Sequence, residues 1–323
     1  MKLRRRRFLY LAAAAVLPVS RTVSAETYPS RPVRIIVAGA AGNTTDIFAR
    51  LMGKWLSERL GQPFIIENRP GAGSNIGTET VVRAPPDGYT LLWVGAPQVI
   101  SPTLYDKLSF NFLRDIAPVA SVQRVANVME VNPAFPAKTV PEFIAYAKAN
   151  PGKVNFASPG TGTSVHVSGE LFKMLTNVNM VHVPYRGTAA ALTDLMSGQV
   201  HVMFDNLPSS FEYIKDGRTR ALAVTTTTRW EGLPDVPTVN DFVPGFEASS
   251  VAGVGVPKNT PTEIIAKLSE EINAGLADPK LKQRITELGA TALSLSPTDY
   301  GKLLADEVEK WGKVVKFAGV KLD

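Results

Sequence analysis

Residues 33–46 read Val33-Arg-Ile-Ile-Val-Ala-Gly-Ala-Ala-Gly-Asn-Thr-Thr-Asp46, an apolar run followed by a glycine-rich turn. The β-branched residues at the start of this stretch predict a buried strand. From Thr45 to Leu60 apolar side chains recur at helical spacing, and Gly61 can end that helix. The stretch therefore predicts a strand, a turn and a helix in succession, which is the unit from which α/β folds are built.

The same alternation of short apolar runs and helical segments continues through most of the chain. Several runs are apolar throughout, as expected for strands that helices cover on both faces. The alternation predicts an α/β fold with mainly parallel sheets. Strands are expected at Val33–Val37, Phe64–Glu67, Thr90–Val94, Val128–Val131, Val154–Ala157, Met180–Val183, Val200–Phe204, Ala221–Thr225 and Val251–Val256.

Capping signals locate several helix ends. Thr139-Val-Pro-Glu142 is typical of a capping box, and Pro151-Gly152 can stop the helix that follows it. Asp278-Pro279 and Ser296-Pro297 each offer an N-cap followed by proline at the first helical position. The C-terminal part of the chain is therefore predicted to be mostly helical, with helices at Pro261–Ala277, Pro279–Leu288 and Pro297–Ala318.

Three glycine-rich turns each follow a predicted strand and precede a predicted helix: Ala38–Asp46, Asn68–Gly77 and Ser158–His166. The unpaired N–H groups and the partial positive charge at a helix N-terminus attract anions. Glycine in a turn can also serve only to reverse the chain, but three turns that all carry Ser, Thr or Asn favour binding. Because they lie in two distant parts of the chain, they suggest two lobes that face each other.

The first 25 residues are interpreted as an export signal. Lys2 and Arg4 to Arg7 precede an apolar stretch that is too short to span a membrane, and Val23-Ser-Ala25 fits a cleavage site. Both Sec and Tat export fit this leader.

The leader holds six of the 35 basic residues and none of the 29 acidic ones, so the mature chain is neutral. We therefore expect no nucleic-acid partner.

Motifs for catalysis, cofactors and metals are missing from the sequence. Gly71-Ala-Gly73 with Gly77 does not fit the spacing of a dinucleotide fingerprint, and there is no P-loop lysine or nucleophile elbow. The chain has no cysteine, and its three histidines are not at zinc-site spacing. We therefore expect no cofactor, no metal and no enzymatic activity. The competing hypothesis is an exported hydrolase or isomerase that uses His166 and Asp205.

Several blocks resemble, in order along the mature chain, the Bug family of solute receptors of tripartite tricarboxylate transporters: Tyr28–Val37, Glu67–Thr78, Asp87–Leu91, Val183–Thr188, Phe204–Leu207 and Leu233–Thr238. The resemblance implies a periplasmic-binding-protein (Venus flytrap) fold, in which two crossing strands join two α/β lobes around a ligand cleft. The C-terminal segment is expected to return to the first lobe. Residues 26–126 plus 247–323 would form that lobe, and residues 127–246 the second.

The resemblance also implies a function. The protein would be a periplasmic, monomeric receptor that captures a small organic carboxylate for the membrane permease subunits of a transporter. The alternative is a sensor that binds its ligand and signals to a membrane partner. In this family backbone N–H groups, small hydroxyls and ordered water hold the carboxylate, rather than an arginine, so Arg186 is interpreted as structural.

Carried over by position, the expected ligand contacts come from both halves of the chain. In the first lobe they are Gly39, Ala40, Ala41, Gly42, Asn43, Thr44, Asp46, Gly73, Ser74, Ala96 and Gln98. In the second lobe they are Ser158, Thr161, Gly162, Thr163, Ser164, His166, Tyr185 and Asp205.

Three segments depart from the family pattern. The first turn begins Ala38-Gly39, where the family usually has proline and an aromatic residue. Ala96-Pro-Gln98 replaces small hydroxyls, and Ser250-Val-Ala252 lacks a frequent aromatic residue. These changes predict a widened or reshaped cavity.

Overall fold

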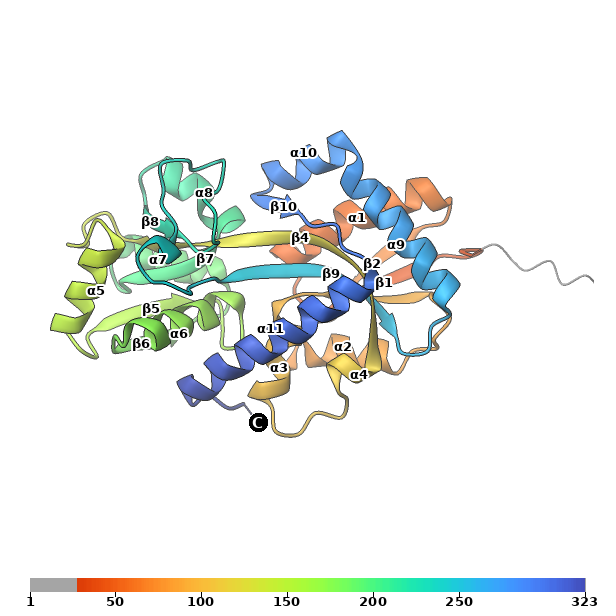
Figure 1. The fold of residues 1–323 in the computed structure, drawn as a ribbon, viewed down its shortest axis with the longest axis horizontal. Helices are drawn as coiled ribbons and strands as arrows, with labels where there is room; N and C mark the ends of the chain where they lie inside the picture. The colour runs from red at the N-terminus through yellow and green to blue at the C-terminus, as the bar shows by residue number, and fades with distance from the viewer. Residues whose placement is uncertain (1–27, 323) are drawn as a thin grey trace, which may run out of the picture.

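The first lobe begins with three parallel strands and the helices that cover them (Figure 1). The computed structural model describes residues 28–322, so the predicted export signal lies outside the described residues. The middle strand β1 pairs in parallel with both of its neighbours, as the sequence predicted. The elements are β1 (Val33–Val37), α1 (Thr44–Leu60), β2 (Phe64–Asn68), the 3₁₀ turn η1 (Ala72–Ser74), α2 (Asn75–Val82), β3 (Thr90–Val94), α3 (Ala96–Leu104) and α4 (Phe112–Asp115).

The second lobe repeats this plan with another set of three parallel strands. Strand β5 lies between β6 and β7 and pairs in parallel with both. The elements are α5 (Val140–Ala149), β5 (Val154–Ser158), α6 (Ser164–Thr176), β6 (Met180–Pro184), α7 (Thr188–Ser197), β7 (Val202–Asn206), α8 (Leu207–Lys215), β8 (Arg220–Val224) and η2 (Val239–Asp241).

Two long strands, β4 (Ile116–Val131) and β9 (Ser249–Pro257), run between the lobes. Strand β4 pairs with β9 as far as Ala126, and from Asn127 onward it pairs with β7 instead. Every pairing of β4 and β9 is antiparallel, so the prediction of mainly parallel sheets holds only inside each lobe. The reason is that these strands carry the chain back and forth between lobes instead of closing a βαβ unit.

The C-terminal segment packs against α1, α3 and β4. It comprises α9 (Thr262–Ala277), α10 (Pro279–Glu287), β10 (Ala290–Ala292) and α11 (Pro297–Ala318). The predicted N-caps are confirmed: Asp278 accepts hydrogen bonds from the first turn of α10, and Ser296 accepts one from the first turn of α11. Helix α11 lies along both lobes and packs against α3 and α6.

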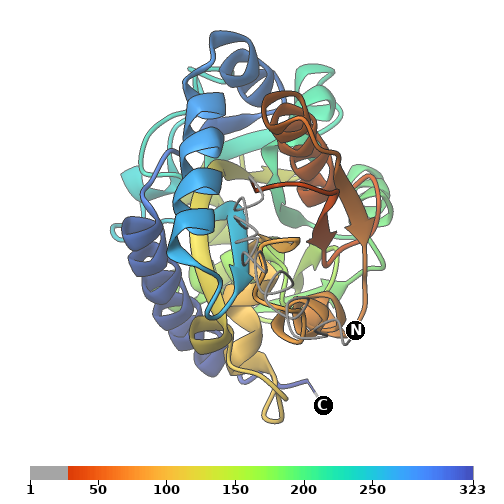
Figure 2. The same ribbon diagram turned by 90° about the vertical axis from the view of Figure 1, so that its right-hand side faces the viewer.

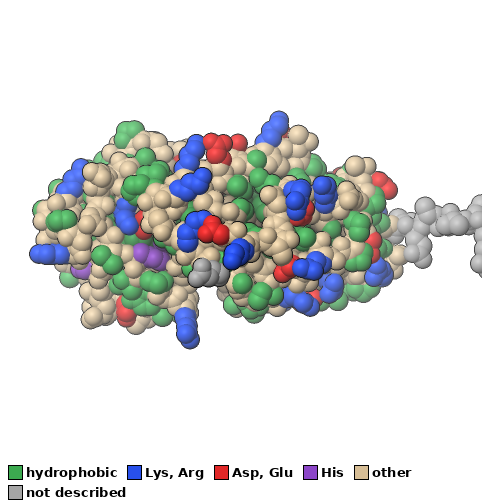
Figure 3. Space-filling model, turned by 90° about the horizontal axis from the view of Figure 1, so that it is seen from below, with side chains coloured by type: hydrophobic (Ala, Val, Ile, Leu, Met, Phe, Trp, Pro, Cys, Tyr) green, Lys and Arg blue, Asp and Glu red, His purple; other side chains and the backbone are tan. Residues whose placement is uncertain are grey.

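Helices cover both faces of the first-lobe sheet (Figure 2). Because side chains alternate across a strand, Val33 and Ile35 pack with the core of α1, α9 and α10, whereas Ile36 packs with the core that includes α3 and α11. Among the described residues no helix is long and apolar enough to cross a membrane. On the face drawn in Figure 3, basic and acidic side chains are interspersed rather than gathered by sign.

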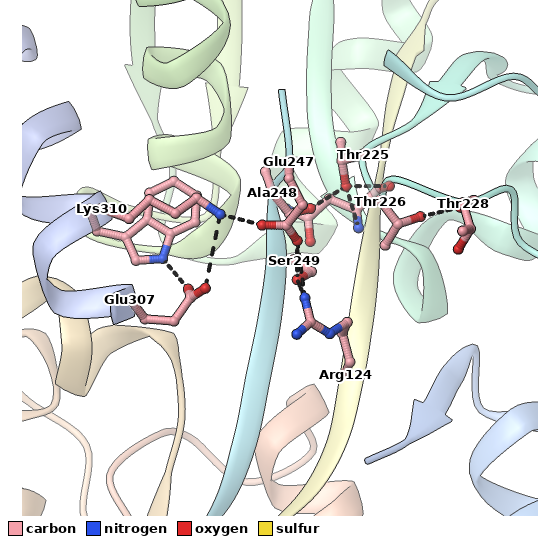
Figure 4. A network of polar contacts seen from close by, with 11 residues as sticks. Arg124, Thr225, Thr226, Thr228, Glu247, Ala248, Ser249, Glu307 and Lys310 are labelled. Atoms are coloured by element: carbon pink, nitrogen blue, oxygen red, sulfur yellow. Dashed lines mark hydrogen bonds and ion pairs between the residues drawn. The ribbon is translucent and has the colours of Figure 1, made fainter. Parts of the chain in front are cut away.

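A network of ion pairs lies where β4 and β9 pass between the lobes (Figure 4). Glu247, just before β9, contacts Arg124 of β4 at 3.1 Å and also binds Lys310 of α11. Burial alone would raise the pKa of Glu247, but Lys310, Ser249 and Arg124 together lower it. The network therefore ties both crossing strands to α11 through one ionised carboxylate.

Candidate functional site

A cavity of about 750 Å³ is lined by residues of both lobes and of the strands that join them. This volume falls in the range of small-molecule sites. Its walls are formed by the segments that follow β1, β3, β5, β6 and β7 and by the crossing strands. The carboxyl ends of parallel strands are where α/β folds place their ligand sites.

Six helix N-termini reach this cavity. Residues at the starts of α1, α2, α3, α6, α7 and α8 all line it, including Thr44, Ser74, Ala96, Ser164, Thr188 and Pro208. The first N–H groups of each helix lack partners within the helix, and each helix dipole adds partial positive charge. The cavity is therefore suited to an anion.

The turn before α1 is organised by Asp46, which lies at the third helical position. The Gly42 N–H donates to Asp46 Oδ2 at 2.8 Å, while the Asp46 N–H donates to the side chain of the N-cap Asn43 at 2.8 Å. Burial alone would raise the pKa of Asp46, but hydrogen bonds from Arg50, Gly42 and Asn68 lower it. Asp46 therefore stabilises the turn by accepting the Gly42 N–H, and it does not line the cavity.

The turn before α6 has the same construction with a histidine in the place of the aspartate. The Gly162 N–H donates to His166 Nδ1 at 3.3 Å, and the His166 N–H donates to the N-cap Thr163 at 3.3 Å. Since Nδ1 accepts a hydrogen bond, a neutral His166 carries its proton on Nε2. That atom lies 4.0 Å from Glu170 Oε1.

A buried pair of imidazole rings lies behind this second turn. The His166 and His182 ring centroids are 4.1 Å apart, and His182 Nε2 is 2.7 Å from Ser158 Oγ. Burial, His182 and Lys173 lower the pKa of His166 to about 3, and burial and Lys173 lower that of His182 to about 4. Both rings are therefore neutral at physiological pH. None of Ser158, His166 and His182 lines the cavity.

Asp205 also lies away from the cavity, in the core beneath α8. Ser210 Oγ lies 2.8 Å from Asp205 Oδ2 and 2.5 Å from Glu130 Oε1. A hydroxyl has only one proton to donate, so both bonds form only if one carboxyl is protonated. Burial raises the pKa of both acids, and Asp205 raises that of Glu130 further. The next residue, Asn206, lines the cavity instead.

Two residues that line the cavity each carry a buried polar atom without a hydrogen-bond partner among the described residues. These atoms are Nε1 of Trp93 on β3 and Oε1 of Gln123 on β4, and each side chain is about 1 % exposed. Buried polar atoms usually have partners, so this unpaired donor and acceptor are unusual, although neither atom is exposed to the cavity. Trp93 also provides an aromatic wall, which the first turn and β9 do not.

The structure brings some of the predicted site residues together and leaves others outside. Those that line the cavity are Gly39, Ala40, Ala41, Gly42, Asn43, Thr44, Ser74, Ala96, Gln98, Thr163 and Ser164. Those that do not line it are Asp46, Gly73, Ser158, Thr161, Gly162, His166, Tyr185 and Asp205. Among the described residues no cluster suited to a metal ion occurs.

Sequence reasoning missed several residues that line the cavity, notably Trp93, Gln123, Arg186 and Asn206. Arg186, interpreted from the sequence as structural, makes no hydrogen bond or ion pair with another described residue. It is also the only charged side chain among the described residues that line the cavity. Its position in the sequence could have indicated a ligand contact, because Arg186 lies next to Gly187, between the end of a strand and the start of a helix.

The chain is similar to known proteins in both sequence and fold. Residues 48–320 match the model of the tripartite tricarboxylate transporter family receptor. An R. palustris protein, Rpa4515 with adipate, is 37 % identical with a TM-score of 0.84, covering 91 % of this chain and 99 % of that one. The periplasmic binding protein BugD is 35 % identical with a TM-score of 0.80, covering 91 % and 99 %. MatC from Rhodopseudomonas palustris with bound malate is 31 % identical with a TM-score of 0.80, covering 89 % and 100 %.

Proposed function

We propose that this chain, which belongs to the tripartite tricarboxylate transporter receptor family, captures a small organic carboxylate in the periplasm and delivers it to a membrane permease. Related proteins of this fold have been solved with adipate and with malate, both of which are carboxylates. We propose that export by the Sec or Tat route brings the chain to the periplasm and that it acts as a monomer.

The observation that carries this proposal is the electrostatic character of the cavity. Six helix N-termini and one guanidinium face it, and among the described lining residues there is no carboxylate. A cation would meet N–H groups and a positive charge in such a site, whereas a carboxylate would be stabilised by both. We propose that the predicted residues that line the cavity, together with Arg186, contact this anion.

A receptor rather than an enzyme is supported by the position of the titratable groups. Ser158 and His182 are within hydrogen-bond distance of each other, but both lie behind the α6 turn and outside the cavity. Glu130 and Asp205 are fully buried beneath α8. No general base therefore faces a bound molecule among the described lining residues.

We also propose that residues 26–126 plus 247–323 form one lobe and residues 127–246 the other. This division is supported by the change in the partner of β4 at Ala126 and Asn127 and by the start of β9 at Ser249. A cleft between two such lobes can close on its ligand by a hinge motion.

Thermal melts and calorimetric titration of the mature chain test the binding proposal. A ligand that binds only the folded state stabilises it by about 2.7 kcal/mol at 100 times Kd. The panel pairs each mono- or dicarboxylic acid with its own amide, and amines and sugars serve as further controls. We expect at least one acid to raise Tm by several degrees while its amide does not. Equal effects of acid and amide would contradict an anion site.

Transport and sensing are separated in cells. Deletion of the gene should abolish uptake of the radiolabelled acid identified in the titration. Normal uptake together with a lost transcriptional response would instead support a sensor. Recovery of the acid unaltered after long incubation with the protein is expected, and its conversion would support the enzyme hypothesis.

A further inference from the structure

The turn between β6 and α7 presents a cation on a fixed backbone. The Tyr185 N–H donates to Ser158 O at 2.9 Å, and Tyr185 Oη donates to Asp194 Oδ2 at 2.6 Å. On the other side Gly187 has φ of 116°, which favours glycine. Arg186 between them is exposed to the cavity, and its guanidinium has no partner among the described residues. The backbone is anchored while the side chain is left available.

No described residue that lines the cavity can neutralise this charge. The lining residues contributed by the first lobe include amides and hydroxyls but no Asp or Glu. If the lobes close, the guanidinium loses water without gaining a protein counter-ion, which is unfavourable. A negative group brought by the ligand would remove this penalty, and a guanidinium presents the planar donor pair that fits a carboxylate.

The cavity already offers another place for a carboxylate. The N-termini of α1 and α6, with their glycine turns, provide backbone N–H groups of the kind that hold anions. Apolar side chains also line the cavity, among them Trp93, Val125 and Ala252. The cavity therefore offers a bound molecule a backbone anion site, a guanidinium and apolar surface.

We propose that Arg186 binds the second carboxylate of a dicarboxylate, so that the receptor prefers dicarboxylates to monocarboxylates of the same length. The inference rests on the proposed function, because it assumes that the first carboxylate occupies the helix N-termini. It assigns Arg186 to specificity, in contrast to the structural role that the sequence suggested.

Calorimetric titration with matched ligands tests the inference. Straight-chain dicarboxylic acids are compared with their own monomethyl esters, which keep the length and one carboxylate but lose the second charge. The wild-type protein is expected to bind the best diacid roughly 10- to 100-fold more tightly than its monoester. In Arg186→Gln this ratio should fall close to one, mainly through loss of diacid affinity. Arg186→Lys should keep part of the preference, because a point charge replaces the planar donor pair.

Arg218→Gln provides the matched control. Arg218 belongs to the same lobe and its loss changes net charge equally, but it does not line the cavity and instead stacks on Tyr213 at 4.8 Å. This variant should keep the wild-type ratio. Thermal melts should give similar Tm values for Arg186→Gln and the wild type, since no described residue pairs with Arg186.

Four outcomes would overturn the inference. Arg186→Gln could keep the full preference for the diacid, in which case another group holds the second carboxylate. It could weaken diacid and monoester by the same factor, in which case Arg186 holds the carboxylate that both share. The wild-type protein could bind both ligands equally well, which would overturn this inference alone. Failure of every acid to bind would overturn the proposed function as well.

Discussion

The turns before α1 and α6 have the same construction in opposite lobes but carry different charges. Gly42 and Gly162 have nearly the same φ, 80° and 82°, and each donates its N–H to the side chain at the third helical position. In the first lobe that side chain is the ionised Asp46, whereas in the second it is the neutral His166. The same backbone geometry is therefore held once by an anion and once by an uncharged ring.

The difference indicates which turn attracts a carboxylate more strongly. A negative Asp46 offsets part of the positive potential at the start of α1, and its ion pair with Arg50 at 2.9 Å only partly compensates. His166 satisfies the same glycine N–H without adding negative charge, so the start of α6 keeps its full potential. Arg186 lies in the same lobe. We therefore expect the second lobe to provide most of the binding energy.

The largest effect is expected from valine at the two glycines. Both substitutions place a β-branched residue at a left-handed φ. A Cβ at Gly162 would lie 2.5 Å from Leu104 Cδ1 of the opposite lobe, whereas a Cβ at Gly42 would have no atom of a described residue within 4 Å. Gly162→Val should weaken ligand binding by more than about 100-fold, and Gly42→Val by about tenfold. Titration of variants with native circular dichroism measures both. Normal binding by Gly162→Val would show that the turn is not part of the site.

The two turns should also respond differently to acid. The pKa of His166 is lowered to about 3 in the folded state. Its contribution to stability is therefore complete above the ordinary histidine pKa and is lost as the pH falls below that ordinary pKa. Between pH 7 and 5 this loss amounts to about 2 kcal/mol for His166 alone, from an unfolded pKa of about 6.5. Asp46 has a lowered carboxyl pKa, so its contribution is lost only below pH 4.

Denaturant unfolding at pH 7, 6 and 5 measures this contrast. His166→Asn should reduce, but not remove, the dependence of stability on pH in this range, because asparagine can accept the Gly162 N–H without titrating while the partly buried His182 still titrates. Asp46→Asn should lower stability at every pH and leave the slope as it is in the wild type. A slope in His166→Asn as steep as in the wild type would assign the acid sensitivity to other groups, such as His182.

Exchanging the charge of the second turn should have a smaller effect on affinity. His166→Asp gives this turn the same residue as the first and places a carboxylate at the start of α6. We expect ligand affinity to fall about tenfold, the size of a helix-terminal charge effect in a partly buried site. His166→Asn is the matched control, because it keeps an acceptor for the Gly162 N–H and adds no charge. Similar losses in both variants would show that the ring itself, and not the charge, matters.

Much of the fold could be predicted from local sequence patterns. The bounds of β1, β3 and α11 match their predictions, because apolar periodicity and capping residues mark them clearly. The first part of β4 was missed, since Pro118, Gln123 and Arg124 interrupt its apolar pattern. Its pairing with β9 depends on contacts with residues far away in the chain, which a local pattern does not contain.

The site was predictable only where local chemistry defines it. The glycine turns were found because a strand, a glycine and a helix cap follow one another in sequence. Asp205 was chosen over Asn206 because β7 was placed at Val200–Phe204 instead of Val202–Asn206. Neighbouring residues of a strand face opposite sides, so the carboxylate lies in the core and the amide lines the cavity. Arg186 carries the same local signal of a strand end, a glycine and a helix start, but Trp93 lies inside a strand and carries none.

The smallest expected difference concerns the two N-caps. The Thr163 hydroxyl donates to Gly160 O at 2.8 Å and accepts from the His166 N–H, so it has no proton left for a ligand. Asn43 Oδ1 accepts from Asp46 N–H and Thr45 Oγ1, which leaves the Asn43 amide N–H groups available at the cavity. Alanine at either position should cost about 1 kcal/mol of stability through loss of the cap.

The two alanine variants should therefore separate in affinity rather than in stability. Thr163→Ala is expected to weaken carboxylate binding about twofold, through a looser turn, and Asn43→Ala about fivefold, through loss of a donor as well. Asn43→Ser keeps an N-cap acceptor but shortens the side chain, so it should recover stability without recovering affinity. Titration and denaturant unfolding of the same three proteins give both quantities. If Thr163→Ala weakens binding more than Asn43→Ala, the Thr163 hydroxyl must reorient toward the ligand when the lobes close, and the first lobe then contributes less through Asn43 than its geometry indicates.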